Sequence, residues 1–294
     1  MKKILKSALK LLNSKLQSKQ VFYYSPNENN AFGRTAVKTK FGFWYVGNVL
    51  DQKDIACGIL NFGVIEPDET QLVLHIYTYL QHKNTPYIFD IGANTGYYSL
   101  LAAYFFKNNA EIYSFEPVQE YAQCIRESIH MNHFGKNIHV CNFALSNIEK
   151  QSTIYVSGTC SSLEQDFNDA STPTEIIELK KLDTFAKDMC PDFIKIDVEG
   201  HELATLEGGK ILLSRCTPIV FIEIIQSLAS HNFVNKNFAA TIKIFTEIGY
   251  DAYIFKGGKL IPLDSSTAAE GVFMYLFVHK DKHLDFIKTL SIYQ

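Results

Sequence analysis

The fold is decided by the stretch Tyr87-Ile-Phe-Asp-Ile-Gly-Ala-Asn-Thr-Gly96, which continues to Ser114-Phe-Glu-Pro117. Its apolar start ends at an acidic residue, which predicts a buried parallel strand. Two glycines then bracket a tight turn, residues 98–104 continue at helical spacing, and a second apolar run covers 112–115. Strand, glycine turn, helix and strand form one βαβ unit of the kind that binds a nucleoside-containing cofactor.

The glycine turn indicates which cofactor. A dinucleotide turn reads Gly-x-Gly-x-x-Gly, so that the backbone can approach a pyrophosphate. Here Gly92 and Gly96 flank Asn94, which stands where the middle glycine would be. An asparagine side chain would crowd a pyrophosphate but can lie beside S-adenosylmethionine, which has no phosphate. We expect the turn to hold the amino-acid end of that molecule, because free amides and a helix N-terminus attract its carboxylate.

Three further positions complete the predicted cofactor site. Asp90 is expected to hold the amino group, directly or through water. Glu116 follows Gly96 by roughly 20 residues, the separation at which an acidic residue meets the ribose hydroxyls. Ala144 opens a loop that is expected to border the adenine. A tight strand–helix connection without any ligand is the alternative, and the two carboxylates argue against it.

Composition narrows the class of protein. The 294 residues make one large domain, or one domain with an extension. The formal net charge of −3 argues against a general nucleic-acid binder. Six cysteines without a Cys-x-x-Cys pair indicate reduced thiols in a cytoplasmic protein, not a zinc site or a disulfide scaffold. No apolar run approaches the roughly 18 residues that span a bilayer, so we expect a soluble protein.

The N-terminal part differs from the rest. We expect residues 1–65 to form an extension and residues 66–294 to form the main domain. Residues 1–20 are basic with an apolar helical face, a pattern that allows weak contact with an anionic membrane surface. Packing on its own domain, or fraying, is the commoner outcome for such a helix. Residues 21–65 are aromatic and punctuated by glycine, which predicts short strands or a cap.

Downstream, strand and helix patterns alternate, which is typical of an α/β fold with a mainly parallel sheet. A second informative stretch runs from Asp192 to Glu202, where a strand ends at Asp197 and a helix over about 201–213 follows. The next strand ends at Glu223. Ligands of open α/β sheets lie beyond the carboxyl ends of the strands, so these carboxylates should face one crevice.

The candidate catalytic residues are Asp197, Glu199, His201 and Glu223. Crowded carboxylates raise one another's pKa, which suits a general base that takes the proton of an attacking hydroxyl. A divalent cation held by Asp197 and Glu223 would instead polarise that hydroxyl, and the sequence leaves both routes open. The competing interpretation is that Glu199 and Glu202 only place negative charge at a helix N-terminus, with His201 a surface residue.

The segments at 89–99, 114–117, 194–202 and 221–224 together resemble the motifs of FkbM-family methyltransferases, over roughly residues 61–224. The resemblance implies a class I methyltransferase fold, Rossmann-like, with a mainly parallel seven-stranded sheet, a reversed final strand and helices on both faces. It also implies S-adenosylmethionine as cofactor and an acceptor hydroxyl on a sugar, polyketide or related metabolite. By motif, residues 90, 92, 94, 96 and 116 would bind cofactor, while 197 and 199 would face the acceptor.

The leading hypothesis is an S-adenosylmethionine-dependent O-methyltransferase acting on a sugar, glycan or related metabolite. A nicotinamide-dependent oxidoreductase is one alternative, and Asn94 counts against it. A catalytically inactive binding protein on the same fold is the other, and the carboxylates at 197, 199 and 223 count against that. The acceptor, the need for a metal and the oligomeric state are left open by the sequence.

Overall fold

The computed structural model describes residues 21–24, 34–107, 109–164, 171–225, 227–228, 233–256, 259–263 and 274–291, so the predicted basic helix at 1–20 lies outside the described residues. The strands are β1 Val21–Tyr24, β2 Arg34–Lys38, β3 Trp44–Gly47, β4 Tyr87–Ile91, β5 Glu111–Phe115, β6 Ile138–Cys141, β7 Ala144–Leu145, β8 Lys150–Tyr155, β9 Thr174–Lys180, β10 Phe193–Ile196, β11 Ile219–Glu223, β12 Ser227–Leu228, β13 Phe233–Val234, β14 Tyr250–Lys256, β15 Lys259–Pro262 and β16 Met274–His279. The helices are α2 Ile55–Phe62, α3 Pro67–Leu80, α4 Tyr97–Phe106, α5 Gln119–Met131, the 3-10 turn η1 Gly158–Cys160, α6 Leu182–Phe185, α7 Glu202–Glu207, α8 Lys210–Cys216, α9 Phe238–Glu247 and α10 Leu284–Ser291.

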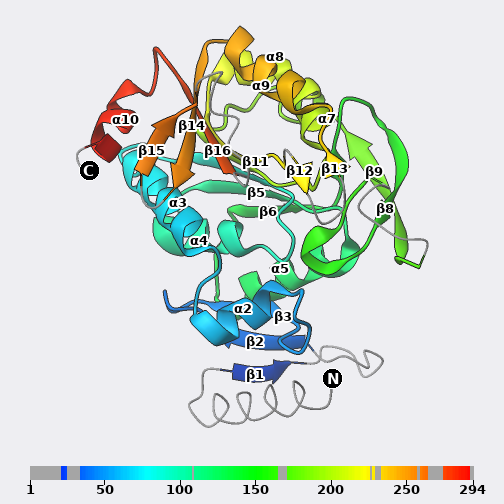
Figure 1. The fold of residues 1–294 in the computed structure, drawn as a ribbon. Helices are drawn as coiled ribbons and strands as arrows, with labels where there is room; N and C mark the ends of the chain where they lie inside the picture. Colours follow the sequence, from blue (N-terminus) through cyan, green and yellow to red (C-terminus); the bar gives the residue numbers. More distant parts are fainter. Residues whose placement is uncertain are drawn as a thin grey trace.

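The central sheet has the order β15-β14-β16-β11-β10-β4-β5-β6 (Figure 1). Pairing is parallel from β11 to β6, whereas β16 is antiparallel to both of its neighbours, β11 and β14. In chain order the parallel strands read 3-2-1-4-5-6, the doubly wound arrangement, with the reversed strand β16 inserted before the last. The predicted seven strands and the reversed final strand are confirmed. An eighth strand, β15, is added at the edge by a hairpin with β14.

Helices cover both faces of this sheet, and the strand sequences show why. Successive side chains of a strand point to opposite faces, so a strand buried on both sides is apolar throughout. Ile88 and Phe193 pack into the cluster that contains α3 and α4, while Phe89 and Ile194 pack into the cluster formed with α6 to α9. Packing in these two cores holds the strands in place along their axes, and this sets the positions of the residues that follow each strand.

The N-terminal segment forms a separate three-stranded sheet, β1-β2-β3, below the main sheet in Figure 1. It is attached to the main domain by buried polar contacts: Arg34 forms an ion pair with Glu127 of α5, and the Tyr45 hydroxyl bonds the Thr95 hydroxyl in the glycine turn. The predicted short strands are therefore present, and one of them contacts the turn that follows β4.

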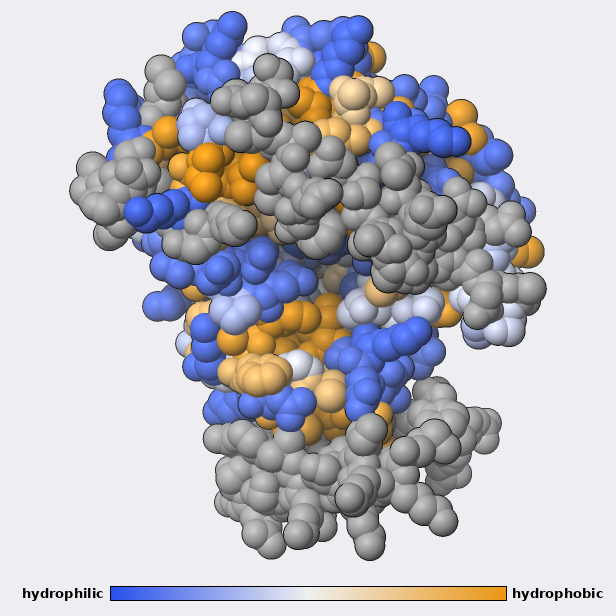
Figure 2. Space-filling view, in the orientation of Figure 1, coloured by the Kyte–Doolittle hydropathy of each residue, from blue (hydrophilic) through white to orange (hydrophobic). Residues whose placement is uncertain are grey.

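Helix α2, which the sequence pattern did not predict, follows this sheet. Its N-cap is Asp54, whose carboxylate accepts the Ala56 N–H at 2.7 Å. Apolar side chains gather on the surface over this part of the molecule (Figure 2), and Phe62 at the end of α2 is 77% exposed. The segment between β3 and α3 thus contains a helix, in addition to the short strands or cap that its composition predicted.

One predicted helix is broken in two. The pattern over 201–213 predicted a continuous helix, but α7 ends at Glu207 and α8 begins at Lys210. A Cβ atom on Gly208 would lie 2.0 Å from the Ser146 carbonyl oxygen, so the chain approaches its neighbour too closely for a side chain here. The break falls at the pair Gly208-Gly209, where glycine lowers helix propensity and the contact with Ser146 requires it.

The expectation that all six cysteines are reduced is wrong for one pair. Cys190 and Cys216 form a disulfide with a Cα–Cα distance of 5.3 Å. It joins the end of α8 to the segment before β10, and the sequence separation of 26 gives no spacing that would reveal the contact. Among the described residues, no helix is long and apolar enough to cross a membrane.

Candidate active site

A cavity of about 430 Å³ opens at the carboxyl ends of the central strands. Its rim carries Glu223, Asp197, Gly92 and Glu116, which follow the neighbouring strands β11, β10, β4 and β5 in that order or end them. Strands lie about 4.8 Å apart, so three spacings separate the two outer carboxylates by about 14 Å. The cavity can therefore hold an elongated ligand whose two ends meet different chemistry, the Glu116 end and the Asp197 end.

At the Glu116 end, one carboxylate is held by backbone amides. The Val118 N–H donates to Glu116 Oε1 and the Asn94 N–H to Oε2, both at 2.8 Å. Burial raises the pKa of this carboxyl to about 8 although both amides act to lower it. Each carboxylate oxygen has a second lone pair, and Glu116 lines the cavity, so the group can also accept hydroxyl donors. This arrangement fits the predicted ribose contact.

The glycine turn shapes the same end. Gly92 has φ +76°, and a Cβ atom there would lie 1.7 Å from the Asp197 carbonyl oxygen, so only glycine fits. Asn94 also has a positive φ, +51°, and its Nδ2 donates to the Gly158 carbonyl at 3.1 Å. Ala144 lines the cavity from β7, as expected for a residue bordering a flat ring.

Two of the predicted cofactor residues do not line the cavity. Gly96 lies at the start of α4 with φ +88°, where a Cβ atom would lie 2.7 Å from Ile125. Asp90 is buried, and its Oδ2 accepts the Ser99 N–H at 2.9 Å and the Ser99 hydroxyl at 2.7 Å. Both residues are placed to fix the turn and the first turn of α4. A direct contact between Asp90 and a ligand in the cavity is not supported by this placement.

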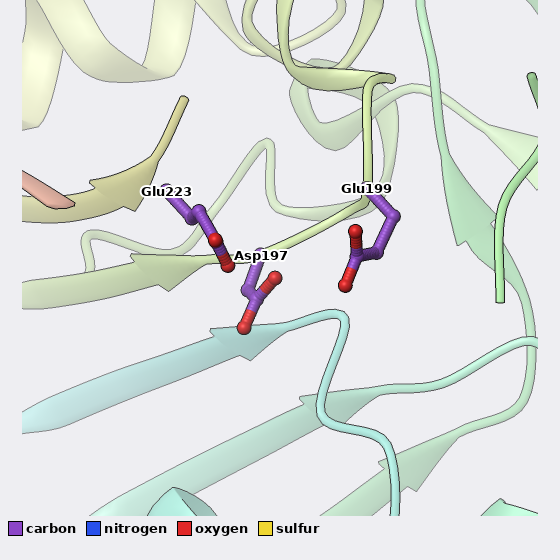
Figure 3. A group of neighbouring side chains, drawn as sticks. All are labelled: Asp197, Glu199 and Glu223. Carbon is purple, nitrogen blue, oxygen red and sulfur yellow. The ribbon is translucent and has the colours of Figure 1, made fainter. Parts of the chain in front are cut away.

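At the Asp197 end, three carboxylates converge. Asp197, Glu199 and Glu223 come from the ends of β10 and β11, and each offers an oxygen within 4.8 Å of the others (Figure 3). The buried Lys195 donates its ammonium to Asp197 Oδ2 at 2.8 Å. Burial acts to raise the pKa of Asp197, but the Lys195 ammonium and a hydrogen bond from Glu223 lower it below its usual value. Burial and the Asp197 charge raise the pKa of Glu223 strongly, so Asp197 is the ionised partner.

Glu199 has a different environment. Its backbone is left-handed, with φ +49°, a conformation that costs a non-glycine residue free energy and is found where the surroundings impose it. The Ser162 hydroxyl donates to the Glu199 carbonyl at 2.6 Å and holds this backbone. Burial, then the charges of Asp197 and Glu202, raise the pKa of Glu199 to about 8. A carboxyl group with a pKa near neutrality is well matched to accept a proton from a substrate.

His201 lines the cavity, but both of its ring nitrogens are engaged. Nδ1 lies 2.9 Å from Glu164 Oε1, and Nε2 lies 3.0 Å from the Ser146 hydroxyl. These bonds connect the loop after β10 to the segment after η1, through Glu164, and to the loop after β7, through Ser146. Glu202 accepts the Gly200 N–H at 2.8 Å, the helix-start role that was expected for it.

The same cluster bears on the predicted metal site. Carboxylate oxygens such as those of Asp197 and Glu223 are the ligands that Mg²⁺ and Ca²⁺ prefer. Lys195 already supplies one positive charge to this cluster. The oxygen-rich cluster is therefore consistent with either route, a carboxylate acting as general base or a bound divalent cation.

The sequence pattern missed the side of the cavity that the N-terminal segment supplies. Glu66, just before α3, and Lys53 and Asp54, just before α2, all line the cavity. The Thr159 N–H donates to the Lys53 carbonyl at 3.2 Å, so the loop around η1 meets this segment across the opening. The acidic first turn of α3 was visible in the sequence, but no local signal could show that Glu66 turns toward strand ends far along the chain.

Part of the chain matches a known protein family. Residues 90–252 match the model of the methyltransferase FkbM domain. No curated protein matches the chain. The matched range begins within β4, ends within β14 and includes every predicted cofactor and catalytic residue, whereas the N-terminal sheet, α2 and Glu66 lie before it.

Solved structures resemble the chain at low identity. The methyltransferase FkbM of Methylobacillus flagellatus KT shares 17% identity, with a TM-score of 0.41 and coverage of 79% of this chain and 62% of that one. A precorrin-6y C5,15-methyltransferase of Geobacter metallireducens GS-15 shares 13%, with a TM-score of 0.39 and coverage of 71% and 88%. A SAM-dependent O-methyltransferase of Thermotoga maritima shares 12%, with a TM-score of 0.39 and coverage of 82% and 76%.

The chain thus spans 62% of the length of the first of these proteins, and none of the three likenesses bears on its acceptor. The domain match covers more than half of the 294 residues and coincides with the strand order and the cavity described above. Membership in the matched family implies an enzyme that uses S-adenosylmethionine. The chain belongs to the FkbM methyltransferase domain family.

Proposed function

We propose that the protein is an S-adenosylmethionine-dependent O-methyltransferase whose acceptor is a hydroxyl of a sugar, glycan or related metabolite. The observation that carries the proposal is Glu199, a carboxyl group with a pKa raised to about 8, held beside the ionised Asp197. A hydroxyl is a poor nucleophile until it loses its proton, and a base with a pKa near neutrality can take that proton at physiological pH.

In this proposal the Glu116 end of the cavity binds the cofactor, and the Asp197 end binds and activates the acceptor. S-adenosylmethionine supplies the methyl group, and its transfer breaks a carbon–sulfur bond and forms a carbon–oxygen bond. Glu116 would accept the ribose hydroxyls, whereas the backbone amides of residues 92–96 already donate within the protein. A nucleoside held by Glu116 would present its methyl group toward the Asp197 end of the cavity.

On the acceptor side, Glu199 takes the proton from the attacking hydroxyl while the new carbon–oxygen bond forms. Asp197, ionised and paired with Lys195, accepts a hydrogen bond from the acceptor or from Glu223 and keeps the hydroxyl in place. Holding the hydroxyl and the methyl carbon in line supplies much of the rate by proximity.

A cytoplasmic location, and an acceptor that is not a nucleic acid, are part of this proposal. The net charge of −3 supports the second point, because a nucleic-acid substrate favours a positive surface. An oxidoreductase is the weaker candidate, since the Asn94 side chain occupies the turn where a pyrophosphate would need close backbone approach.

The deciding experiment is calorimetric titration of the purified protein with S-adenosylhomocysteine, with NAD as the comparison ligand, followed by transfer of labelled methyl to glycan and glycoside fractions. Micromolar binding of S-adenosylhomocysteine, no binding of NAD and base-stable label on the acceptor are expected. Binding of NAD in place of S-adenosylhomocysteine would overturn the proposal, and label on carbon or nitrogen would overturn the O-methylation assignment.

A further inference from the structure

Glu66 is the one carboxylate at the Asp197 end of the described cavity that lies before the matched family domain. It immediately precedes Pro67, and its backbone is left-handed with φ +42° and ψ +70°. Its side chain lines the cavity, and its Oε2 accepts the Tyr98 hydroxyl at 2.7 Å. Glu66 itself is exposed, whereas Tyr98 is buried in α4, so this bond anchors the exposed carboxylate to a fixed point of the core.

The charges around Glu66 place it among the acceptor-side residues. The Lys195 ammonium lies over the Tyr98 ring, 4.8 Å from its centroid, and is also bound to Asp197. Burial raises the pKa of Glu66, Lys195 acts to lower it, and Asp197 acts to raise it. Glu66 in turn contributes to the raised pKa of Glu199. Glu66 therefore belongs to the electrostatic group that surrounds the proposed methyl-transfer point.

Four carboxylates, at positions 66, 197, 199 and 223, share this end of the cavity with one buried ammonium, that of Lys195. Carboxylate oxygens accept hydrogen bonds and repel anions. An acceptor with several hydroxyl donors meets favourable partners here, and one that presents a phosphate at this end meets repulsion. Lys53, the cavity's exposed cation, lines it from the segment before α2.

We propose that Glu66 is an acceptor-binding residue: its carboxylate accepts a hydrogen bond from a second hydroxyl of an uncharged polyol, beside the hydroxyl that is methylated, and it excludes acceptors phosphorylated there. The Tyr98 hydroxyl orients this carboxylate. The inference rests on the proposed O-methyltransferase function. It assigns a role in acceptor choice to the N-terminal segment, which the family domain does not include.

The test compares wild type, Glu66→Gln and Asp68→Asn, a matched control on the first turn of the same helix α3. The glutamine keeps the size of the side chain and an oxygen for Tyr98, so it removes only the charge. Labelled methyl transfer is measured with methyl glycosides of glucose, mannose, galactose and rhamnose, and with the 6-phosphates of the first three. Binding of S-adenosylhomocysteine is measured for each variant.

The expected result is turnover of unphosphorylated glycosides, and in Glu66→Gln a KM at least about tenfold higher with kcat changed less than about threefold. The Asp68→Asn variant should match wild type. All three proteins should bind S-adenosylhomocysteine equally. A Glu66→Gln variant with wild-type KM, or a preference of wild type for the 6-phosphates, overturns the proposal. Loss of S-adenosylhomocysteine binding in wild type would instead reject the function on which it rests.

A second readout keeps the test decisive when none of the glycosides is turned over. In protein labelled with ¹³C at the glutamate carboxyl carbon and saturated with S-adenosylhomocysteine, the Glu66 resonance is assigned by its absence in Glu66→Gln. Titration with the same methyl glycosides should shift that resonance. A resonance that stays unmoved by every glycoside overturns the proposal, whether or not turnover is found.

Discussion

Both ends of the cavity carry carboxylates, but the surroundings of these carboxylates differ. At one end Glu116 is alone, and its oxygens are bound by two backbone amides. At the other end Asp197, Glu199 and Glu223 crowd within 4.8 Å, and one ammonium, from Lys195, is bound to the group. Backbone amides are fixed by the fold, so they hold a carboxylate for binding. Carboxylates that face each other shift each other's pKa, which prepares one of them for proton transfer.

One edge of the sheet thus carries both a binding end and a proton-transfer end. The strands of the Glu116 end are followed by tight turns whose amides converge, and those of the Asp197 end are followed by carboxylates on adjacent strands. Binding and catalysis can then be separated by mutation. A substitution at the Glu116 end should lower cofactor affinity, and one at the Asp197 end should lower turnover.

The largest effect is expected for Glu199→Gln. The variant cannot accept the hydroxyl proton, so kcat should fall about a thousandfold while S-adenosylhomocysteine affinity stays within about twofold. Wild-type turnover should rise as pH increases through about 8, because the base acts when deprotonated. The variant should lack this rise. An equal loss in the exposed control Glu207→Gln, or an unchanged pH profile, would contradict the assignment.

Asp197→Asn should affect both turnover and folding. Removing this carboxylate leaves the Lys195 ammonium buried without its closest counter-charge, which should cost about 3 kcal/mol of stability in thermal unfolding. Turnover should also fall strongly, with S-adenosylhomocysteine affinity retained in the folded protein. The double variant Lys195→Met/Asp197→Asn should recover stability but not turnover. Full activity in Asp197→Asn would remove it from the mechanism.

Glu116→Ala tests the binding end. Two hydrogen bonds to the ribose are lost, so S-adenosylhomocysteine should bind about a hundredfold more weakly in calorimetry. Glu116→Gln keeps the size of the side chain and should also bind weakly, because its NH2 group faces one of the two backbone N–H donors that now bind the carboxyl oxygens. Unchanged affinity in both variants would show that the ribose lies elsewhere.

A change outside both ends should alter stability and not ligand binding. The disulfide Cys190–Cys216 lies away from the cavity, and the Cys190→Ser/Cys216→Ser double variant should lose about 2 kcal/mol of unfolding free energy. S-adenosylhomocysteine affinity should not change. The Cys57→Ser variant is the control, since Cys57 is a free cysteine. A large loss of affinity in the disulfide variant would mean that the two regions are coupled.

The smallest effect is expected from chelation. Because Lys195 already supplies positive charge to Asp197, removal of divalent ions with EDTA should leave methyl transfer within experimental error of the untreated enzyme. Restoration of lost activity by Mg²⁺ or Ca²⁺ after EDTA treatment would contradict this. It would assign Asp197 and Glu223 to the metal route that the sequence left open.

Local sequence patterns were sufficient to predict the strands and turns that carry the site. Short sequence patterns are enough to predict strand ends and glycine turns. They therefore predicted the apolar strands, the turn at Gly92 and the strand-end carboxylates Glu116, Asp197 and Glu223. The reversed strand and the parallel sheet followed from alternation and family resemblance. Asp90 was predicted to hold the amino group of the cofactor, but its orientation toward Ser99 depends on which face of β4 it occupies.

The fold class, the cofactor class and the carboxylates at the strand ends could be predicted from short stretches of sequence, because each depends on residues close together in the chain. Which of these carboxylates face one another depends on the packing of the whole fold. That packing paired Lys195 with Asp197, engaged both nitrogens of His201, joined Cys190 to Cys216 and brought Glu66 to the cavity. The physical reason is that pKa shifts, ion pairs and disulfides depend on distances in space, and those distances are set by the packing of the whole sheet and its helices.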